Sequence, residues 1–197
     1  MQIIALSSSR GTTFQAILDA IARGELASPC IGLVTDREDR GCVAKARAAK
    51  IPVRIVERSR LESREDYDRR LEAAFEILRG KTSKKDIVIA AVGWMWVLSP
   101  WLVHRWIRRI VNVHPSLLPK YPGAHAHRDV LKAGDGESGM TIHYIDEGVD
   151  TGPILLQKTC PVLPDDTEDT LKSRVQALEV EWYPKVLGMM ERGEMNI

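Results

Sequence analysis

Two polar residues interrupt a run of β-branched residues at Ile110–His114, and their spacing could bring them together for chemistry. Asn112 and His114 alternate with valines in this run. Alternate side chains of a β-strand lie on one face, so the amide and the imidazole are expected side by side. Pro115 has no N–H to donate and is expected to end the strand. The pattern predicts a polar pair at the edge of a sheet, where α/β proteins commonly hold their reactive groups.

A third candidate residue, Asp150, lies in a glycine-flanked turn between two strand-like segments. A carboxylate beside an imidazole would fix its tautomer and raise its pKa. An amide donor, a charged imidazole and a carboxylate could together stabilise an oxyanion during acyl transfer. The alternative is that Asn112 and His114 are only hydrogen-bonded groups of the core.

A hydroxyl- and glycine-rich turn, Ser8–Thr13, separates a predicted strand at Gln2–Ser7 from a helix expected to begin near Thr12. Free N–H groups at the start of a helix attract anions, so this turn is a candidate phosphate site. A side chain added at Gly11 is expected to enter that site. A helix cap without a ligand is the alternative.

The segment Asn112–Pro119, taken together with Asp150, resembles the signature of the formyltetrahydrofolate-dependent formyltransferases. The run Lys120–Arg128 is most similar to the branch of purine biosynthesis whose acceptor is glycinamide ribonucleotide. It is less similar to the branches that formylate transfer RNA or sugars. The resemblance covers nearly the whole chain, from Met1 to about Leu187.

This resemblance implies direct transfer of a formyl group from 10-formyltetrahydrofolate, as co-substrate, to an amine, without a metal. Asn112 and His114 would donate to the developing oxyanion. Asp150 would keep His114 protonated and could relay the proton of the amine through water. The pKa of His114 is therefore expected above its ordinary value.

The binding residues are assigned by the resemblance more than by their chemistry. The substrate side comprises Gly11, Thr12 and Thr13 at the phosphate, and Glu179 at the glycinamide group. The folate side comprises Arg64, Met95, Trp96, Val97 and Leu98, together with Asn112. Thr13 stands where the family usually has asparagine, and Trp96 replaces a customary arginine. Binding through the main chain is expected to persist at both positions.

Several alternatives stay open. His125 and His127, with Asp150, could be metal ligands of a hydrolase. A folate- or nucleotide-binding protein without turnover is a second alternative. The nearest alternatives keep the chemistry and change the acceptor to a sugar nucleotide, an aminoacyl-tRNA, or water. His143 lies near the folate pocket by resemblance, and an orienting role toward Asp150 or a water is equally open.

Strand-like and helical segments alternate up to Asn112, which predicts a Rossmann-like α/β fold, a wound, mostly parallel sheet with helices on both faces. The expected strands are Cys30–Thr35, Pro52–Val56 and Ile87–Val92, and the expected helices are Arg40–Lys50, Arg64–Arg79, Arg128–Ala133 and Asp166–Met190. The runs Ser138–Asp146 and Pro153–Val162 are expected to add antiparallel strands. Trp101 and Trp106 are expected in the core, and Arg105, Arg108 and Arg109 on a solvated helix face.

The bulk properties are those of one soluble domain spanning residues 1–197. The net charge of +1 gives no general attraction to nucleic acid or membrane, so small molecules are the expected partners. Three widely spaced cysteines argue against a disulfide framework. The short apolar run at the N-terminus resembles a first strand more than a signal peptide or membrane span. A cytoplasmic protein, monomeric or homodimeric, is expected.

Overall fold

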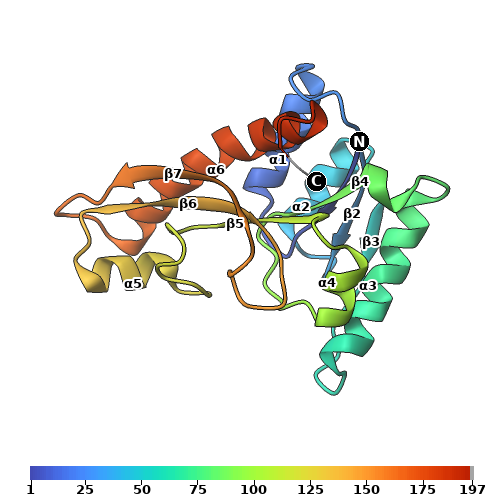
Figure 1. Cartoon of the computed structure of the whole chain (residues 1–197), viewed down its shortest axis with the longest axis horizontal. Coiled ribbons are helices and arrows are strands. Elements are labelled where there is room, and N and C mark those ends of the chain that lie inside the picture. The colour runs from blue at the N-terminus through green and yellow to red at the C-terminus, as the bar shows by residue number, and fades with distance from the viewer. Residues whose placement is uncertain (196–197) are drawn as a thin grey trace.

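The computed structural model describes residues 1–195, which are built around one seven-stranded sheet (Figure 1). The strand order is β3-β2-β1-β4-β5-β6-β7. The parallel strands are β1 (Gln2–Leu6), β2 (Cys30–Thr35), β3 (Val53–Ile55), β4 (Ile87–Ala91) and β5 (Ile110–His114). The strands β6 (Glu137–Tyr144) and β7 (Ile154–Pro161) continue the sheet in antiparallel pairing. The predicted α/β class, with a parallel sheet and an antiparallel C-terminal addition, is confirmed.

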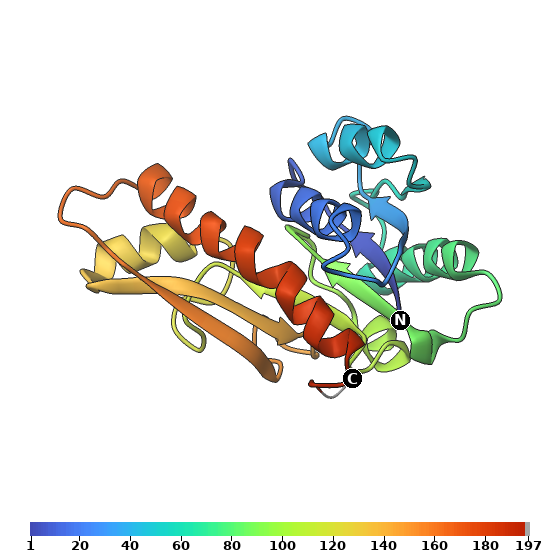
Figure 2. The ribbon, with the colours of Figure 1, turned by 90° about the horizontal axis from the view of Figure 1, so that it is seen from above.

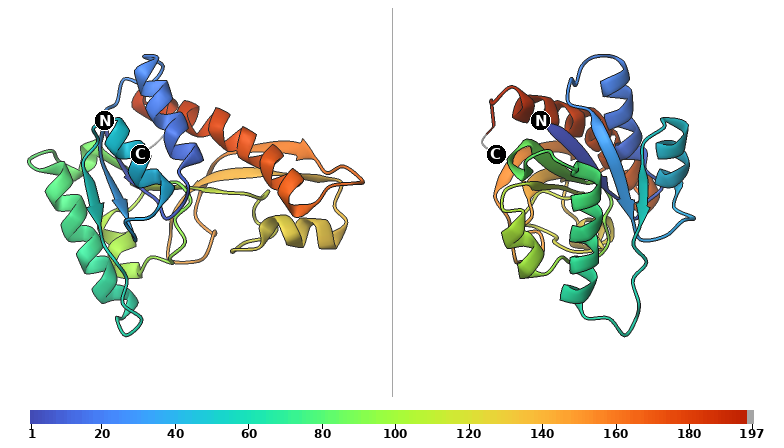
Figure 3. Two further views of the ribbon diagram at one scale, coloured as in Figure 1. Left: turned by 180° about the vertical axis from the view of Figure 1, so that it is seen from behind. Right: turned by 90° about the vertical axis from the view of Figure 1, so that its right-hand side faces the viewer.

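Helices cover both faces of this sheet (Figure 3). Strand β1 shows why, because Ile3 and Ala5 pack into one apolar cluster while Ile4 and Leu6 pack into another. The first cluster is covered by α1 (Thr12–Ala22), α2 (Gly41–Ala48), α5 (Ala126–Ala133) and α6 (Glu168–Glu191). The second is covered by α3 (Arg64–Arg79) and α4 (Pro100–Arg105), and a short 3-10 turn, η1 (Lys84–Asp86), precedes β4.

The long helix α6 runs from the β6–β7 hairpin back to α1 (Figure 2). Its N-terminus is fixed by a capping box, in which the side chains of Thr167 and Thr170 each accept from the main-chain N–H of the other. Near its other end, the Tyr183 hydroxyl donates to the Val111 carbonyl of β5 at 2.8 Å. Helix α6 is therefore held in a fixed position relative to the strand that carries Asn112 and His114.

The segment between β4 and β5 differs from the expectation. Helix α4 ends at Arg105, and Arg108 and Arg109 lie in the turn that follows, where Arg108 has a φ of +53°. The prediction that these two arginines share a helix face was wrong. Arg105 is the last residue of α4. Its side chain is not free in solvent, because its Nε donates to Glu72 Oε1 at 3.0 Å.

The two tryptophans of this segment divide between core and surface. Trp106 is 1% exposed and packs edge-on against Phe75, which confirms its predicted core position. Trp101 is only half-buried at the edge of the second cluster, so its predicted core position was wrong. Its ring lies between the guanidinium groups of Arg69 and Arg105, at 4.4 and 4.9 Å from the ring centroid.

Two further features are stated for residues 1–195. No helix in residues 1–195 is both long enough and apolar enough to cross a bilayer. The three thiols, Cys30, Cys42 and Cys160, are buried and unpaired. The expected domain of residues 1–197 includes residues 196 and 197, which lie outside the described part.

Candidate active site

A cavity of about 400 Å³ opens beyond the carboxyl ends of β4 and β5. Its walls come from the loop 93–98 after β4, the end of β5, the turn 145–150 and one face of α6. Carboxyl ends of parallel strands are the usual place for ligands in such sheets, because the loops that follow them diverge there. The strand that carries the predicted polar pair therefore ends in the wall of this cavity.

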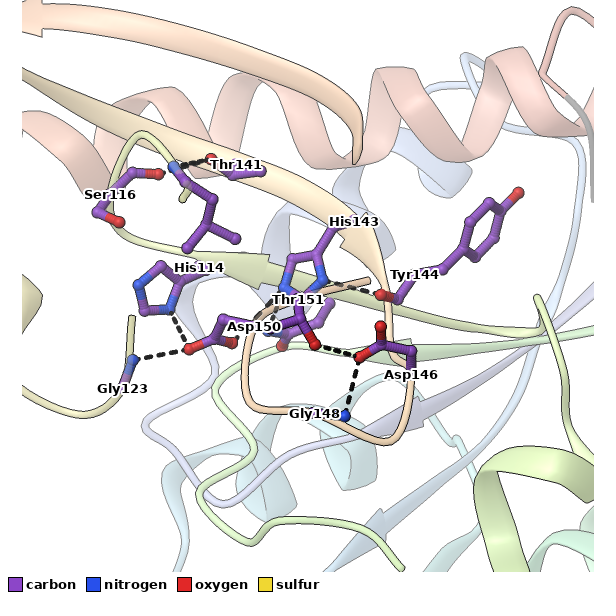
Figure 4. A network of polar contacts seen from close by, with 12 residues as sticks. His114, Ser116, Gly123, Thr141, His143, Tyr144, Asp146, Gly148, Asp150 and Thr151 are labelled. Atoms are coloured by element: carbon purple, nitrogen blue, oxygen red, sulfur yellow. Dashed lines mark hydrogen bonds and ion pairs between the residues drawn. The ribbon is translucent and has the colours of Figure 1, made fainter. Parts of the chain in front are cut away.

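The predicted pairing of Asn112 and His114 is confirmed as geometry. Both lie on β5, in alternation with valines that pack into the first apolar cluster, and both line the cavity. The antiparallel strand β6 extends the polar face, because its register places His143 opposite Asn112 and Thr141 opposite His114. Figure 4 shows His114, Thr141 and His143 on these two strands.

Asp150 is brought to this face by a tight turn after β6 (Figure 4). Its φ of +56° is in the left-handed region, which aspartate tolerates better than most residues. Its Oδ2 accepts from the Gly123 N–H at 2.8 Å and lies 3.2 Å from Nδ1 of His114. Burial opposes ionisation, but the His143 ring, the Gly123 N–H and the His114 ring outweigh it, so the pKa of Asp150 lies below its usual range.

The expected electrostatics of His114 need correction. Its ring is 4% exposed, and burial, which disfavours the charged form, lowers the pKa of His114 below its ordinary value. Asp150 and the Tyr121 carbonyl, 2.8 Å from Nε2, both raise the pKa without overcoming burial. The predicted upward direction was therefore wrong for the protein without substrates, although the predicted partner of the imidazole is present.

The turn after β1 lies beside the cavity and does not line it. Gly11 adopts a φ of +77° at the N-cap of α1, and its N–H donates to the Ser9 hydroxyl at 3.1 Å. Thr12 is partly exposed, whereas Thr13 is buried. The Thr13 hydroxyl donates to Oε2 of Glu179 at 3.2 Å, which joins this turn to the cavity wall.

Helix α6 contributes a polar face that sequence reasoning found only in part. Lys172, Gln176 and Glu179 all line the cavity. Their i, i+4, i+7 spacing is that of one helix face, and this spacing was a signal that could have identified the first two. Burial raises the pKa of Glu179 to about 7, against the opposing effects of Thr13 and Lys172.

The predicted folate segment 95–98 lines the cavity, and Met95, Trp96 and Val97 are among the exposed apolar residues. The Trp96 indole N–H donates to Oδ2 of Asp36 at 3.1 Å. Asp36 is 2% exposed and also binds the Arg40 guanidinium through both of its oxygens. Sequence reasoning missed Asp36, because nothing in a strand-end aspartate indicates a partner sixty residues away.

Arg64 is not brought to the cavity. It is the first residue of α3, its side chain is exposed, and it does not line the wall. The position of Arg64 in the structure therefore does not support its predicted contact with the folate.

The two histidines of the metal alternative lie in different environments. His127 lines the cavity, whereas His125 is exposed at the N-cap of α5. Within residues 1–195, no group of three or more His, Cys, Asp or Glu side chains could hold a metal ion.

Comparison with known proteins agrees with this geometry. The family model described as Formyl transferase matches residues 1–187. The phosphoribosylglycinamide formyltransferase of Escherichia coli (strain K12) is 36% identical over 197 residues, which cover 100% of this chain and 90% of that protein. The trifunctional purine biosynthetic protein adenosine-3 of Drosophila melanogaster is 38% identical over 195 residues, which are 98% of this chain but only 14% of that longer protein.

Solved structures are similar over the whole chain. The glycinamide ribonucleotide transformylase 1 of Symbiobacterium toebii has a TM-score of 0.92 at 31% identity, covering 100% of this chain and 90% of that one. The phosphoribosylglycinamide formyltransferase of Coxiella burnetii has a TM-score of 0.90 at 36% identity, with the same coverage of 100% and 90%. On this evidence the chain is an enzyme of the formyltransferase class and belongs to the formyl transferase family.

Proposed function

We propose that this enzyme transfers the formyl group of 10-formyltetrahydrofolate to the amine of glycinamide ribonucleotide. The observation that carries the proposal is the placement of Asn112 and His114 side by side in the cavity wall, with Asp150 3.2 Å from the imidazole. The printed names of the E. coli and S. toebii relatives support this acceptor. No metal takes part in the proposed reaction.

The amine of the acceptor is the nucleophile, so the protein need not supply one. Its attack on the formyl carbon forms a C–N bond and moves electrons onto the formyl oxygen. Asn112 and His114 donate hydrogen bonds to that oxygen, and each such donor contributes about 3–4 kcal/mol to transition-state stabilisation. Both nitrogens of His114 face acceptors, so the contact with the Tyr121 carbonyl must open before this donation.

Asp150 has two proposed tasks. Its charge favours the imidazolium of His114 once the oxyanion forms nearby. Its lowered pKa keeps it ionised, so it can also accept the proton of the attacking amine through a water molecule. Collapse of the tetrahedral centre then breaks the bond to the folate nitrogen, which takes up the proton that the amine released.

Substrate binding is proposed along two walls. Gly11–Thr13 hold the phosphate at the start of α1, and Glu179 receives the glycinamide amine. Met95, Trp96, Val97 and Leu98 hold the folate, largely through the main chain. The unpaired buried thiols are consistent with the proposal that the protein works in the cytoplasm.

The test is consumption of formyl-folate by purified protein with and without glycinamide ribonucleotide. We expect turnover that requires the nucleotide and a formylated nucleotide as product. Turnover without it, yielding formate, would favour the hydrolase alternative. A folded Asn112→Ala protein is the control, and its kcat should fall about a hundredfold or more.

A further inference from the structure

His143 is the most buried ionisable side chain on the polar face, at 1% exposure, and the mechanism above gives it no step of its own. It lies on β6 directly opposite Asn112 of β5. We propose that His143 is a positioning residue, whose neutral ring, protonated on Nδ1, holds the Asn112 amide in the orientation that formyl transfer needs. This inference rests on the proposed function.

The partners of the ring fix its tautomer. Nδ1 of His143 lies 2.8 Å from the Tyr144 carbonyl oxygen, which can only accept, so Nδ1 carries the proton. Nε2 lies 3.1 Å from Nδ2 of Asn112, an amide nitrogen that can only donate, so Nε2 carries none. A ring with a proton on Nε2 would instead require Asn112 to turn its oxygen toward the histidine.

The titratable neighbours of the ring are Asp150 and His114. Oδ1 of Asp150 is 3.6 Å from Nε2, beyond ordinary hydrogen-bond length, so Asn112 is the better placed partner of that nitrogen. With Nε2 unprotonated, the ring does not donate to the carboxylate, and the Gly123 N–H and the His114 ring are the groups that favour its ionised form. His114 lies on the other side of the carboxylate, 3.2 Å from Oδ2. The Asn112 amide and the Asp150 carboxylate thus flank one ring nitrogen.

This arrangement has a consequence for the reaction. The amide nitrogen of Asn112 has two N–H groups, and His143 takes one of them. The other remains for the cavity, which Asn112 lines. Without an acceptor at Nε2 the amide could rotate by half a turn, and an oxygen would then replace the donor beside the reacting atoms.

Two substitutions separate this role from simple packing. In His143→Gln, a side-chain oxygen can reach the place of Nε2 and accept from Asn112. In His143→Asn, the shorter amide can keep the contact of Nδ1 with the Tyr144 carbonyl but leaves Asn112 without an acceptor. We expect His143→Asn to lower kcat about tenfold or more with the KM of both substrates within about twofold. His143→Gln should retain most of kcat, and the reverse order would overturn the proposal.

A double-mutant cycle identifies the residue through which His143 acts. In the Asn112→Ala background, His143→Asn should lower kcat no further, because the group that it positions is gone. The full loss of kcat in that background would assign the effect to Asp150 and overturn the proposal.

A readout without turnover keeps the inference separate from the proposed function. Nitrogen-15 NMR of the wild-type protein at neutral pH should show His143 protonated on Nδ1 and unprotonated on Nε2. A proton on Nε2 would overturn the proposal, even if the substituted proteins fail to fold. Absence of nucleotide-dependent turnover in wild type would instead overturn the proposed function and leave the tautomer assignment standing.

Discussion

Thr13 on α1 donates a hydrogen bond to Glu179 on α6, with Oγ1 and Oε2 3.2 Å apart. This contact joins the turn after the first strand to the helix that closes the sheet. Burial raises the pKa of Glu179 to about 7, while Thr13 and Lys172 act in the opposite direction. The Glu179 carboxyl therefore gains or loses its proton near neutral pH. Thr13 helps to set the pH at which this happens.

Thr13→Val should move this transition to higher pH. Valine has the shape of threonine but cannot donate to Glu179, so the pKa of the carboxyl should rise. If the carboxylate receives the substrate amine, the KM for glycinamide ribonucleotide should increase as pH falls through about 7 in wild type. In Thr13→Val the increase should begin at higher pH. The measurement is KM from pH 6 to 9, with the KM for formyl-folate as the internal control. Identical profiles for the two proteins would disprove the coupling.

Trp96→Phe should weaken folate binding without slowing the chemistry. Phenylalanine keeps a ring near the Arg58 guanidinium, 4.7 Å from the indole centroid, but loses the donor to Asp36. A hydrogen bond to a charged group at a half-exposed position contributes about 1 kcal/mol, or roughly fivefold. We expect the KM for formyl-folate to rise by about that factor while kcat stays constant. Trp101→Phe, outside the cavity wall, is the matched control. A fall in kcat for Trp96→Phe alone would contradict the proposal.

Most of the scaffold could be predicted because its signals are local. Helix α3 has the predicted bounds, since Ser63 accepts from the Asp66 N–H at its start and Gly80 follows its last residue. Strand β5 likewise ends before Pro115, and its two valines pack into the first apolar cluster while Asn112 and His114 line the cavity. That the chain forms one domain stays a prediction, as does its oligomeric state.

The features of the site that were predicted wrongly or not at all share a different physical origin. The pKa of His114 depends on how deeply its ring is buried and on its contact with the Tyr121 carbonyl, and no strand pattern encodes either. The contact of Trp96 with Asp36 depends on β2 and β4 lying on either side of β1. Contacts made between distant segments set burial and partners, and single-sequence patterns report neither.

Gly11→Ala should destabilise the fold. A Cβ at Gly11 would lie 2.9 Å from Cα of Cys42 on α2, and the φ of +77° is unfavourable for alanine. The added carbon therefore points at α2, and the expectation that it enters a phosphate site was wrong. We expect a loss of about 2–3 kcal/mol in the free energy of unfolding.

Gly24→Ala is the matched control for this substitution, because its φ is +73° and nothing lies within 4 Å of the added carbon. It should lose only about 1 kcal/mol. Urea unfolding of the two variants measures the difference. Equal losses would show that the close approach of Gly11 to α2 has no energetic consequence.

Asp150→Asn should lower the pKa of His114 further. Burial already lowers that pKa, and the Asp150 charge partly offsets the effect. Asparagine keeps the shape, tolerates the φ of +56°, and can still accept from the Gly123 N–H, so the turn should persist. Removing the negative charge leaves burial less opposed, and His114 should lose its proton at lower pH. Activity that needs the imidazolium should then fall off at lower pH on the alkaline side.

The sign of this shift separates the His114 effect from other roles of Asp150. The acidic limb of kcat/KM depends partly on the substrate amine, which must be unprotonated to attack, so that limb should move less than the alkaline limb. The measurement is kcat/KM from pH 5.5 to 9 for both proteins, together with NMR titration of His114. Asp39→Asn changes the net charge equally at an exposed ion pair with Arg37, and it should leave the His114 titration unchanged. If His114 titrates alike in wild type and Asp150→Asn, the two residues are not coupled, and Asp150 acts on the water or the amine alone.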